Sequence, residues 1–179
     1  MAAENRASNT APIPPDSGDV RTDFAVRTAR KPDIPEITRL NGQLGYPESS
    51  ATIFRRFGRL RKDRRDHRLF VAVAGRSTGQ SDRGVIGWTH VFIDTLLTVG
   101  PRGVIGGLVV DEQWRSRGVG AALLQRAEQW VQRKGFTEVV VHTNVVRTRA
   151  HSFYEKCGYK LIKQSRVYTK FISRDDRTS

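Results

Sequence analysis

The pattern of apolar and polar residues along the chain changes between a period of two and a period close to 3.6. A period of two, or a short unbroken apolar run, is typical of β-strands. It predicts strands over residues 23–28, 68–74, 85–93, 104–110, 138–143, 159–164 and 166–172. In this prediction residues 75–84 form a polar surface turn and residues 94–102 form a connector.

Four segments carry apolar residues at helical spacing and predict helices over residues 32–44, 49–62, 118–134 and 150–157. The chain is therefore expected to form one α/β (α+β) domain over residues 23–173. Its sheet is expected to be mixed, mostly antiparallel, with six or seven strands and about four helices around it. Residues 1–22 lack apolar periodicity and are expected to be a disordered leader, and residues 174–179 a flexible tail.

An Arg-x-x-Gly-x-Gly motif stands between the predicted strand 104–110 and the predicted helix that begins at residue 118. Glycines allow main-chain N–H groups to approach a ligand closely, and a helix N-terminus adds a partial positive charge. The motif predicts a phosphate-binding loop that comprises Arg115, Ser116, Arg117, Gly118, Val119, Gly120 and Ala121. Glycine-rich turns before helices are common, so the elements that follow decide its meaning.

The order strand, Arg-x-x-Gly-x-Gly, long helix, strand and then Phe-Tyr-Glu-Lys-Cys-Gly-Tyr at 153–159 resembles the GCN5-related N-acetyltransferase (GNAT) family. The resemblance covers roughly residues 24–172 and is strongest over 105–170. Residues 143–147, followed by 150–154, look most like the branch that includes aminoalkylphosphonate and other small-amine acetyltransferases.

The resemblance implies acetyl-coenzyme A as co-substrate and no metal. The loop would hold its pyrophosphate, and the main chain of Leu108, Val109 and Val110 would pair with its pantetheine arm. Tyr154 would lie near the thiol as general acid, since an unperturbed tyrosine, with a pKa of about 10, keeps its proton at neutral pH. A core role is the alternative for Tyr154. Asn144 would bind the coenzyme amides or a water, or would only shape a strand-end turn.

The general base is not apparent, because residues 104–110 contain no carboxylate where the family often supplies a glutamate. A water chain, an amine that arrives neutral, His90 and His142 remain open, and each histidine has a structural alternative. Gly106 and Gly107 could give room to a substrate, and Tyr46 could line an amine pocket or only end a helix.

The composition of the chain bears on its location and on the partners that it could bind. The 179 residues contain one cysteine, Cys157, which excludes an internal disulfide and favours a cytoplasmic location. No apolar run is long enough to cross a membrane. The net charge of +13 includes a dense arginine block over residues 55–68, either a solvated helix face or an anion-binding surface. Apart from Phe54 and Phe57, which are expected in the core, the block lacks aromatic residues that could stack bases, and this argues against nucleic acid as a partner.

The sequence therefore predicts an N-acetyltransferase that moves the acetyl group of acetyl-coenzyme A to a primary amine of a small molecule. A non-catalytic module that binds acyl-coenzyme A and an enzyme that acetylates proteins or peptides are the alternatives. A homodimer remains open.

Overall fold

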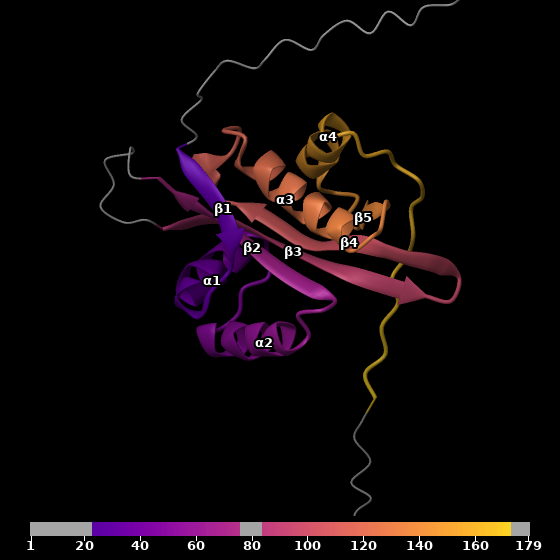
Figure 1. Cartoon of the computed structure of the whole chain (residues 1–179), viewed down its shortest axis with the longest axis horizontal. Coiled ribbons are helices and arrows are strands. Elements are labelled where there is room, and N and C mark those ends of the chain that lie inside the picture. The colour runs from indigo at the N-terminus through magenta and orange to yellow at the C-terminus, as the bar shows by residue number, and fades with distance from the viewer. Residues whose placement is uncertain (1–22, 76–83, 173–179) are drawn as a thin grey trace, which may run out of the picture.

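The computed structural model describes residues 23–75 and 84–172, and its centre is a five-stranded sheet in the order β1-β2-β3-β4-β5 (Figure 1). The strands are β1 (Phe24–Thr28), β2 (His67–Ala74), β3 (Val85–Leu96), β4 (Val99–Val110) and β5 (Val139–Val141). The first four pair antiparallel, and β4 pairs with β5 in parallel. The prediction of a mixed, mostly antiparallel sheet is confirmed.

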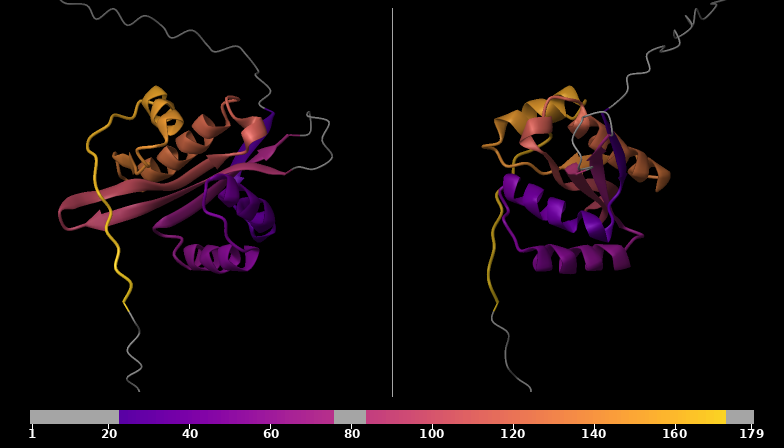
Figure 2. Two further views of the ribbon diagram at one scale, coloured as in Figure 1. Left: turned by 180° about the vertical axis from the view of Figure 1, so that it is seen from behind. Right: turned by 90° about the vertical axis from the view of Figure 1, so that its left-hand side faces the viewer.

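Helices cover both faces of the sheet (Figures 1 and 2). A short 3-10 turn, η1 (Lys31–Asp33), leads into α1 (Ile34–Gln43), which lies with α2 (Ser50–Lys62) on one face. The other face carries α3 (Val119–Arg133) and α4 (Thr148–Lys156). The hydroxyl oxygen of Ser49 accepts a hydrogen bond from the Thr52 main-chain N–H at 3.2 Å, which fixes the start of α2.

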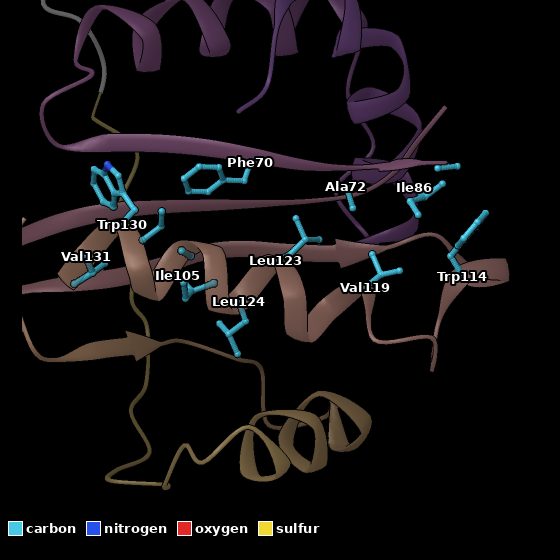
Figure 3. Close-up of a cluster of buried hydrophobic side chains, with 13 residues drawn as sticks. Phe70, Ala72, Ile86, Ile105, Trp114, Val119, Leu123, Leu124, Trp130 and Val131 are labelled. Carbon is cyan, nitrogen blue, oxygen red and sulfur yellow. The ribbon is translucent and has the colours of Figure 1, made fainter. Parts of the chain in front are cut away.

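The core forms two layers, one on each face of the sheet. Figure 3 shows the layer beneath α3, where Leu123 and Val131 pack toward Phe70 and Ile105 from the strands. The apolar face predicted for α3 is the buried one, so this prediction is confirmed. The second layer packs α1 and α2 against the opposite face, with Leu40 and Val71 fully buried.

An ion pair ties α1 to the end of β4. Nη1 of Arg39 lies 2.6 Å from Oδ2 of Asp111, whose side chain is largely buried. Burial alone would raise the pKa of Asp111, but hydrogen bonds from Arg39 and from the Gln113 main chain outweigh it and lower that pKa. The end of α1 is thereby held beside the loop that follows β4.

The prediction of six or seven strands is too high, because residues 159–164 and 166–172 are not strands. β5 is only three residues long and pairs with β4 alone among the described residues, so residues 160–172 stay exposed.

The connector predicted at 94–102 is also wrong. The alternation weakens there, but β3 runs to Leu96 and β4 begins at Val99, which makes one long hairpin.

Residues 1–22 and 174–179, expected as leader and tail, and residues 76–83 of the predicted polar turn lie outside the described residues. Within the described parts of the chain, no helix has the length and apolar character needed to span a membrane.

Candidate active site

A wedge opens in the sheet where β4 and β5 separate. Their pairing covers only Gly103 to Ile105 on β4 and ends at Val141 on β5. At that point the register with β3 shifts, so that His90 faces Gly107 while Val91 faces Ile105, and Gly106 is the extra residue of a β-bulge. β4 then continues to Val110 along β3. Its edge away from β3 has no strand partner there among the described residues.

The three predicted residues of β4 line this wedge through their main chain. Val109 is buried under α1 and α2, and Leu108 and Val110 are half-buried against the layer beneath α3. Their side chains belong to the core, which leaves the main chain as the part that an extended ligand can meet. A ligand with amide groups could add to β4 much as a further strand would.

The predicted phosphate loop has the backbone geometry of an anion cradle. After the short turn η3 (Glu112–Trp114), Ser116 has a φ of 63° and Gly118 a φ of 79°. Main-chain nests, which bind anions with successive N–H groups, are built with left-handed residues, and Ser116 and Gly118 supply two such positions in this loop. Ser116 is the one residue other than glycine with positive φ in the described chain, and such strain is typical of functional sites.

The first turn of α3 completes the cradle. Gly118 is the N-cap, and no side chain caps the helix. The N–H groups of Val119, Gly120 and Ala121 therefore present the positive end of a helix of 15 residues. A Cβ at Gly118 would meet no atom within 4 Å, so the loop is open above this residue.

The two arginines of the loop make different contacts. Arg115 turns back to β4, where its Nε donates to the Val110 carbonyl at 3.2 Å, and its Nη2 lies 3.3 Å from Glu112. The guanidinium of Arg117 lies 5.1 Å from the centre of the Trp114 ring. Arg115 thus holds the loop against the strand, a role that the sequence pattern could not distinguish from a phosphate contact.

Tyr154 lies on α4 within an aromatic cluster. Its ring meets those of Phe153 and Tyr159 edge-on, at 5.1 and 5.7 Å between centres. Burial, followed by the neighbouring charge of Cys157, raises the pKa of Tyr154 to about 12, although Arg147 acts against this. The phenol therefore stays protonated at neutral pH. Cys157, a free cysteine beside it, is half-buried.

Close packing brings α4 to the cradle. A Cβ on Gly120 would lie 3.2 Å from Cε2 of Phe153, so the absence of a side chain there lets α4 approach the first turn of α3. The second glycine of the motif thus has a packing role that the sequence analysis did not identify. Phe153, the residue before Tyr154, consequently stands beside the phosphate loop.

Asn144 shapes the turn between β5 and α4. Its Oδ1 accepts a hydrogen bond from the Val146 N–H at 3.1 Å, and its carbonyl oxygen accepts one from the Arg147 N–H at 3.0 Å. These contacts match the turn alternative and leave the side-chain NH₂ group for another partner. Asn144, His142 and Tyr154 all line one cavity of about 990 Å³.

Two histidines meet on the other face of the sheet, next to the bulge. Nε2 of His90 lies 3.1 Å from Nδ1 of His67, and Nε2 of His67 lies 3.7 Å from Oδ2 of Asp63. Nδ1 of His90 lies 3.0 Å from the position that a Cβ on Gly106 would take. The His90 imidazole thus occupies the space where a side chain of β4 would begin. Residue spacing alone gave no signal for the pair.

These surroundings determine the protonation of the His90 imidazole. Burial, together with the charge of His67, lowers the pKa of His90 to about 4. At neutral pH its imidazole is uncharged. When the proton is on Nε2, that atom donates to His67 and leaves Nδ1 as an acceptor beside Gly106.

Arg147 links the turn before α4 to the segment after α1. Its Nη2 donates to the Leu44 carbonyl at 2.8 Å, and its guanidinium lies 5.7 Å from the centre of the Tyr46 ring. Tyr46 is 60% exposed, and its role in an amine pocket stays a prediction. Arg147 was not among the predicted site residues, because only the fold brings it next to Leu44.

The comparisons with known proteins agree with this geometry. A model of the acetyltransferase (GNAT) family matches residues 33–159. The chain is 28% identical over 147 residues to an N-alpha-acetyltransferase of Sulfurisphaera tokodaii, a match that covers 82% of this chain and 86% of that protein. It is 33% identical over 60 residues to an aminoglycoside N(6')-acetyltransferase of Stenotrophomonas maltophilia, which covers 34% of this chain and 39% of that protein.

A solved structure of an aminoglycoside N-acetyltransferase in complex with CoA superposes with a TM-score of 0.71 at 20% identity. The superposition covers 82% of this chain and 94% of that chain. At this identity the likeness concerns the fold.

We predict that Gly118→Ala weakens acetyl-coenzyme A binding at least tenfold. Alanine disfavours the left-handed backbone by roughly 1–2 kcal/mol, so the loop would shift and its N–H groups would lose their common direction. Gly135→Ala is the matched control, because Gly135 has a φ of 86° at the other end of α3. Calorimetric titration should show the loss for Gly118→Ala alone, and equal affinities in both variants would refute the cradle.

Proposed function

The chain belongs to the GNAT acetyltransferase family, and from this premise we propose that it transfers the acetyl group of acetyl-coenzyme A to a primary amine of a small molecule. The observation that supports the proposal is the unpaired edge of β4 in front of the loop at 115–121. Phe153 packs α4, which carries Tyr154, against the first turn of α3 at Gly120.

Binding rests on main-chain groups. The N–H groups of residues 117–121 would hold the pyrophosphate. The edge of β4 that faces away from β3 at Leu108, Val109 and Val110, where the Val110 carbonyl already accepts a hydrogen bond from Arg115, would pair with the pantetheine arm. Acetyl-coenzyme A supplies an activated thioester carbonyl. A β4 N–H in the wedge would polarise the carbonyl oxygen and stabilise the negative charge that develops on it.

Tyr154 is proposed as the general acid. As the new C–N bond forms and the C–S bond breaks, its hydroxyl would give a proton to the departing sulfur. The raised pKa keeps this proton in place beforehand but makes its release harder. The positive charge of Arg147 lowers the pKa of Tyr154 and would favour the step.

His90 is proposed as the first proton acceptor, in place of the carboxylate that β4 lacks. Nδ1 of His90 would take the amine proton beside Gly106, while Nε2–H passes its own proton to His67. His67 is partly exposed and stands near Asp63, so it can release a proton to solvent. Because one proton enters His90 as another leaves, no charge needs to remain on this buried imidazole.

Two other functions each have one observation in their favour. The N-alpha-acetyltransferase relative covers most of the chain, which supports a peptide N-terminus as acceptor. The absence of a β4 carboxylate supports a module that binds acyl-coenzyme A without turnover. The single cysteine fits a cytoplasmic location for each of them.

The test of the proposed function is thiol release from acetyl-coenzyme A with the purified chain and a panel of acceptors. The panel holds aminoglycosides, aminoalkylphosphonates, polyamines and short peptides. Thiol release that depends on a small amine, with the acetylated amine identified by mass, is the expected result. Release with peptides alone would favour the peptide enzyme, and tight binding without release would favour the sensing module.

We predict that Tyr154→Phe lowers kcat about a hundred- to ten-thousand-fold, the usual contribution of a general acid. The variant keeps the ring and its packing, so coenzyme affinity should stay within about twofold. Tyr159→Phe is the matched control, because it removes a hydroxyl from the neighbouring ring, where the group donates to Glu128 at 2.9 Å. Full turnover by Tyr154→Phe, with chemistry shown to be rate-limiting, would make Tyr154 a core residue.

We predict that His90→Gln lowers kcat about a hundredfold near neutral pH. The loss should shrink as the pH rises toward the pKa of the acceptor, because an amine that is already neutral needs no base. A pKa of about 4 for His90 also means that its own protonation lowers activity only below about pH 4. His142→Gln tests the rival candidate. A constant loss across pH, or the loss in His142→Gln instead, would contradict the role of His90.

A further inference from the structure

The exposed side of α2 carries positive charge that its own sequence does not balance. The helix contains four arginines and one lysine, and it has no aspartate or glutamate. Cations at the end of a helix are stabilised by its dipole, which accounts for Arg59, Arg61 and Lys62 in the last turn. The dipole does not account for Lys31 and Arg64, which lie outside α2 and are brought beside it by the fold.

A hollow of about 280 Å³, called here the α2 hollow, lies where these cations meet. The cationic residues that line it are Lys31, Arg61, Lys62 and Arg64. No aspartate or glutamate of the described chain lines it, and none of the four cations takes part in an ion pair among the described residues. Like charges that gather without a counter-charge attract anions, so the α2 hollow is complementary to a negative group.

The α2 hollow also has an aromatic lining, formed by Phe54 and Phe57. Phe57 is buried as expected, but Phe54 is 47% exposed and is not the core residue that the sequence predicts. Nζ of Lys31 lies 5.8 Å from the centre of the Phe54 ring, and the Arg61 guanidinium lies 6.0 Å from the centre of the Phe57 ring. The exposed ring removes the argument that this block of the chain has no aromatic residue on which a base could stack.

Gly58 keeps the α2 hollow open. Phe54, Gly58 and Lys62 are spaced four residues apart, so they lie along one side of α2. A Cβ on Gly58 would meet no atom within 4 Å, so the packing of the described residues does not require a glycine there. Glycine inside a helix is destabilising relative to alanine. Its presence is explained if the space beside it receives a ligand.

We propose that the α2 hollow binds a nucleotide, with the phosphate among the four cations and the base against Phe54. A phosphate monoester carries close to two negative charges at neutral pH, and a base is a flat ring that stacks on aromatic side chains. The hollow lies at α2, on the opposite face of the sheet from α3 and α4 (Figures 1 and 2). It is therefore separate from the loop at 115–121 and does not depend on the proposed function.

The test is calorimetric titration of the full chain with AMP and GMP at fixed ionic strength, with adenosine and inorganic phosphate as partial ligands. The nucleotides should bind about tenfold or more tightly than either partial ligand, because only they contact both the cations and the ring. Gly58→Leu fills the hollow and favours the helix, so it should abolish binding without lowering the melting temperature. Gly42→Leu is the matched control, because Gly42 is an exposed glycine of α1 that also has open space around it, and it should bind normally.

A second pair of variants separates the site from a general attraction to positive charge. Lys62→Gln and Arg59→Gln remove the same charge from α2, but of the two residues only Lys62 lines the hollow. Lys62→Gln should weaken nucleotide binding about fivefold, and Arg59→Gln should weaken it less than about twofold. Equal losses in the two variants, binding that survives Gly58→Leu, or phosphate that binds as tightly as AMP would overturn the proposal.

Two further titrations identify the source of the nucleotide and separate the two anion sites. A short single-stranded RNA that binds more tightly than AMP and is lost in Gly58→Leu identifies a strand as the ligand, whereas weaker binding identifies the free nucleotide, and both support the site. Gly118→Ala should weaken acetyl-coenzyme A binding and leave AMP binding unchanged. Loss of AMP binding in Gly118→Ala would assign AMP to the loop at 115–121 and overturn this proposal alone.

Discussion

The candidate site depends on the point at which β4 stops pairing with β5. A strand inside a sheet has its N–H and C=O groups satisfied on both sides, which leaves nothing for a ligand. Here β4 stays paired with β3 to its end, while its other edge has no strand partner after Ile105 among the residues that the structure describes. A β-bulge lies at Gly106, and the turn η3 connects Val110 to the candidate phosphate loop.

The proposed proton transfers would come from opposite faces of the sheet. Tyr154 is carried by α4 on one face, and His90 stands on the other face with His67 and Asp63 behind it. A Cβ on Gly106 would lie 3.0 Å from Nδ1 of His90, whereas a Cβ on Gly107 would lie 2.9 Å from the ring of Trp88. Gly106, in the strand where the family often has a glutamate, thus leaves room for the imidazole of His90, the proposed base.

Much of the fold follows from local patterns in the sequence. The apolar face of α3 and the Arg-x-x-Gly-x-Gly motif specify the strand-loop-helix unit without knowledge of the rest, because both are short-range features. The patterns gave wrong predictions where strand formation depends on pairing between residues far apart in the sequence. Residues 159–172 alternate like strands, yet no described strand pairs with them, and the weakly patterned residues 94–102 are held in a hairpin by their partner strand.

The same distinction applies to the site. The sequence located the loop and Tyr154, because each belongs to a contiguous motif. It did not pair His67 with His90, or Arg147 with Leu44, because these residues lie 23 and 103 positions apart. It also gave Gly120 only a ligand-binding role, whereas the structure places Phe153 against it.

The unpaired edge of β4 and the loop at 115–121 are proposed to hold acetyl-coenzyme A together. Amide hydrogen exchange, measured with and without saturating acetyl-coenzyme A, reports on both segments in one experiment. We expect slower exchange in residues 107–110 and 116–121, and no change along the arginine-rich face of α2. Protection confined to α2, or unchanged exchange in the wedge and the loop under conditions where binding is measured, would contradict it.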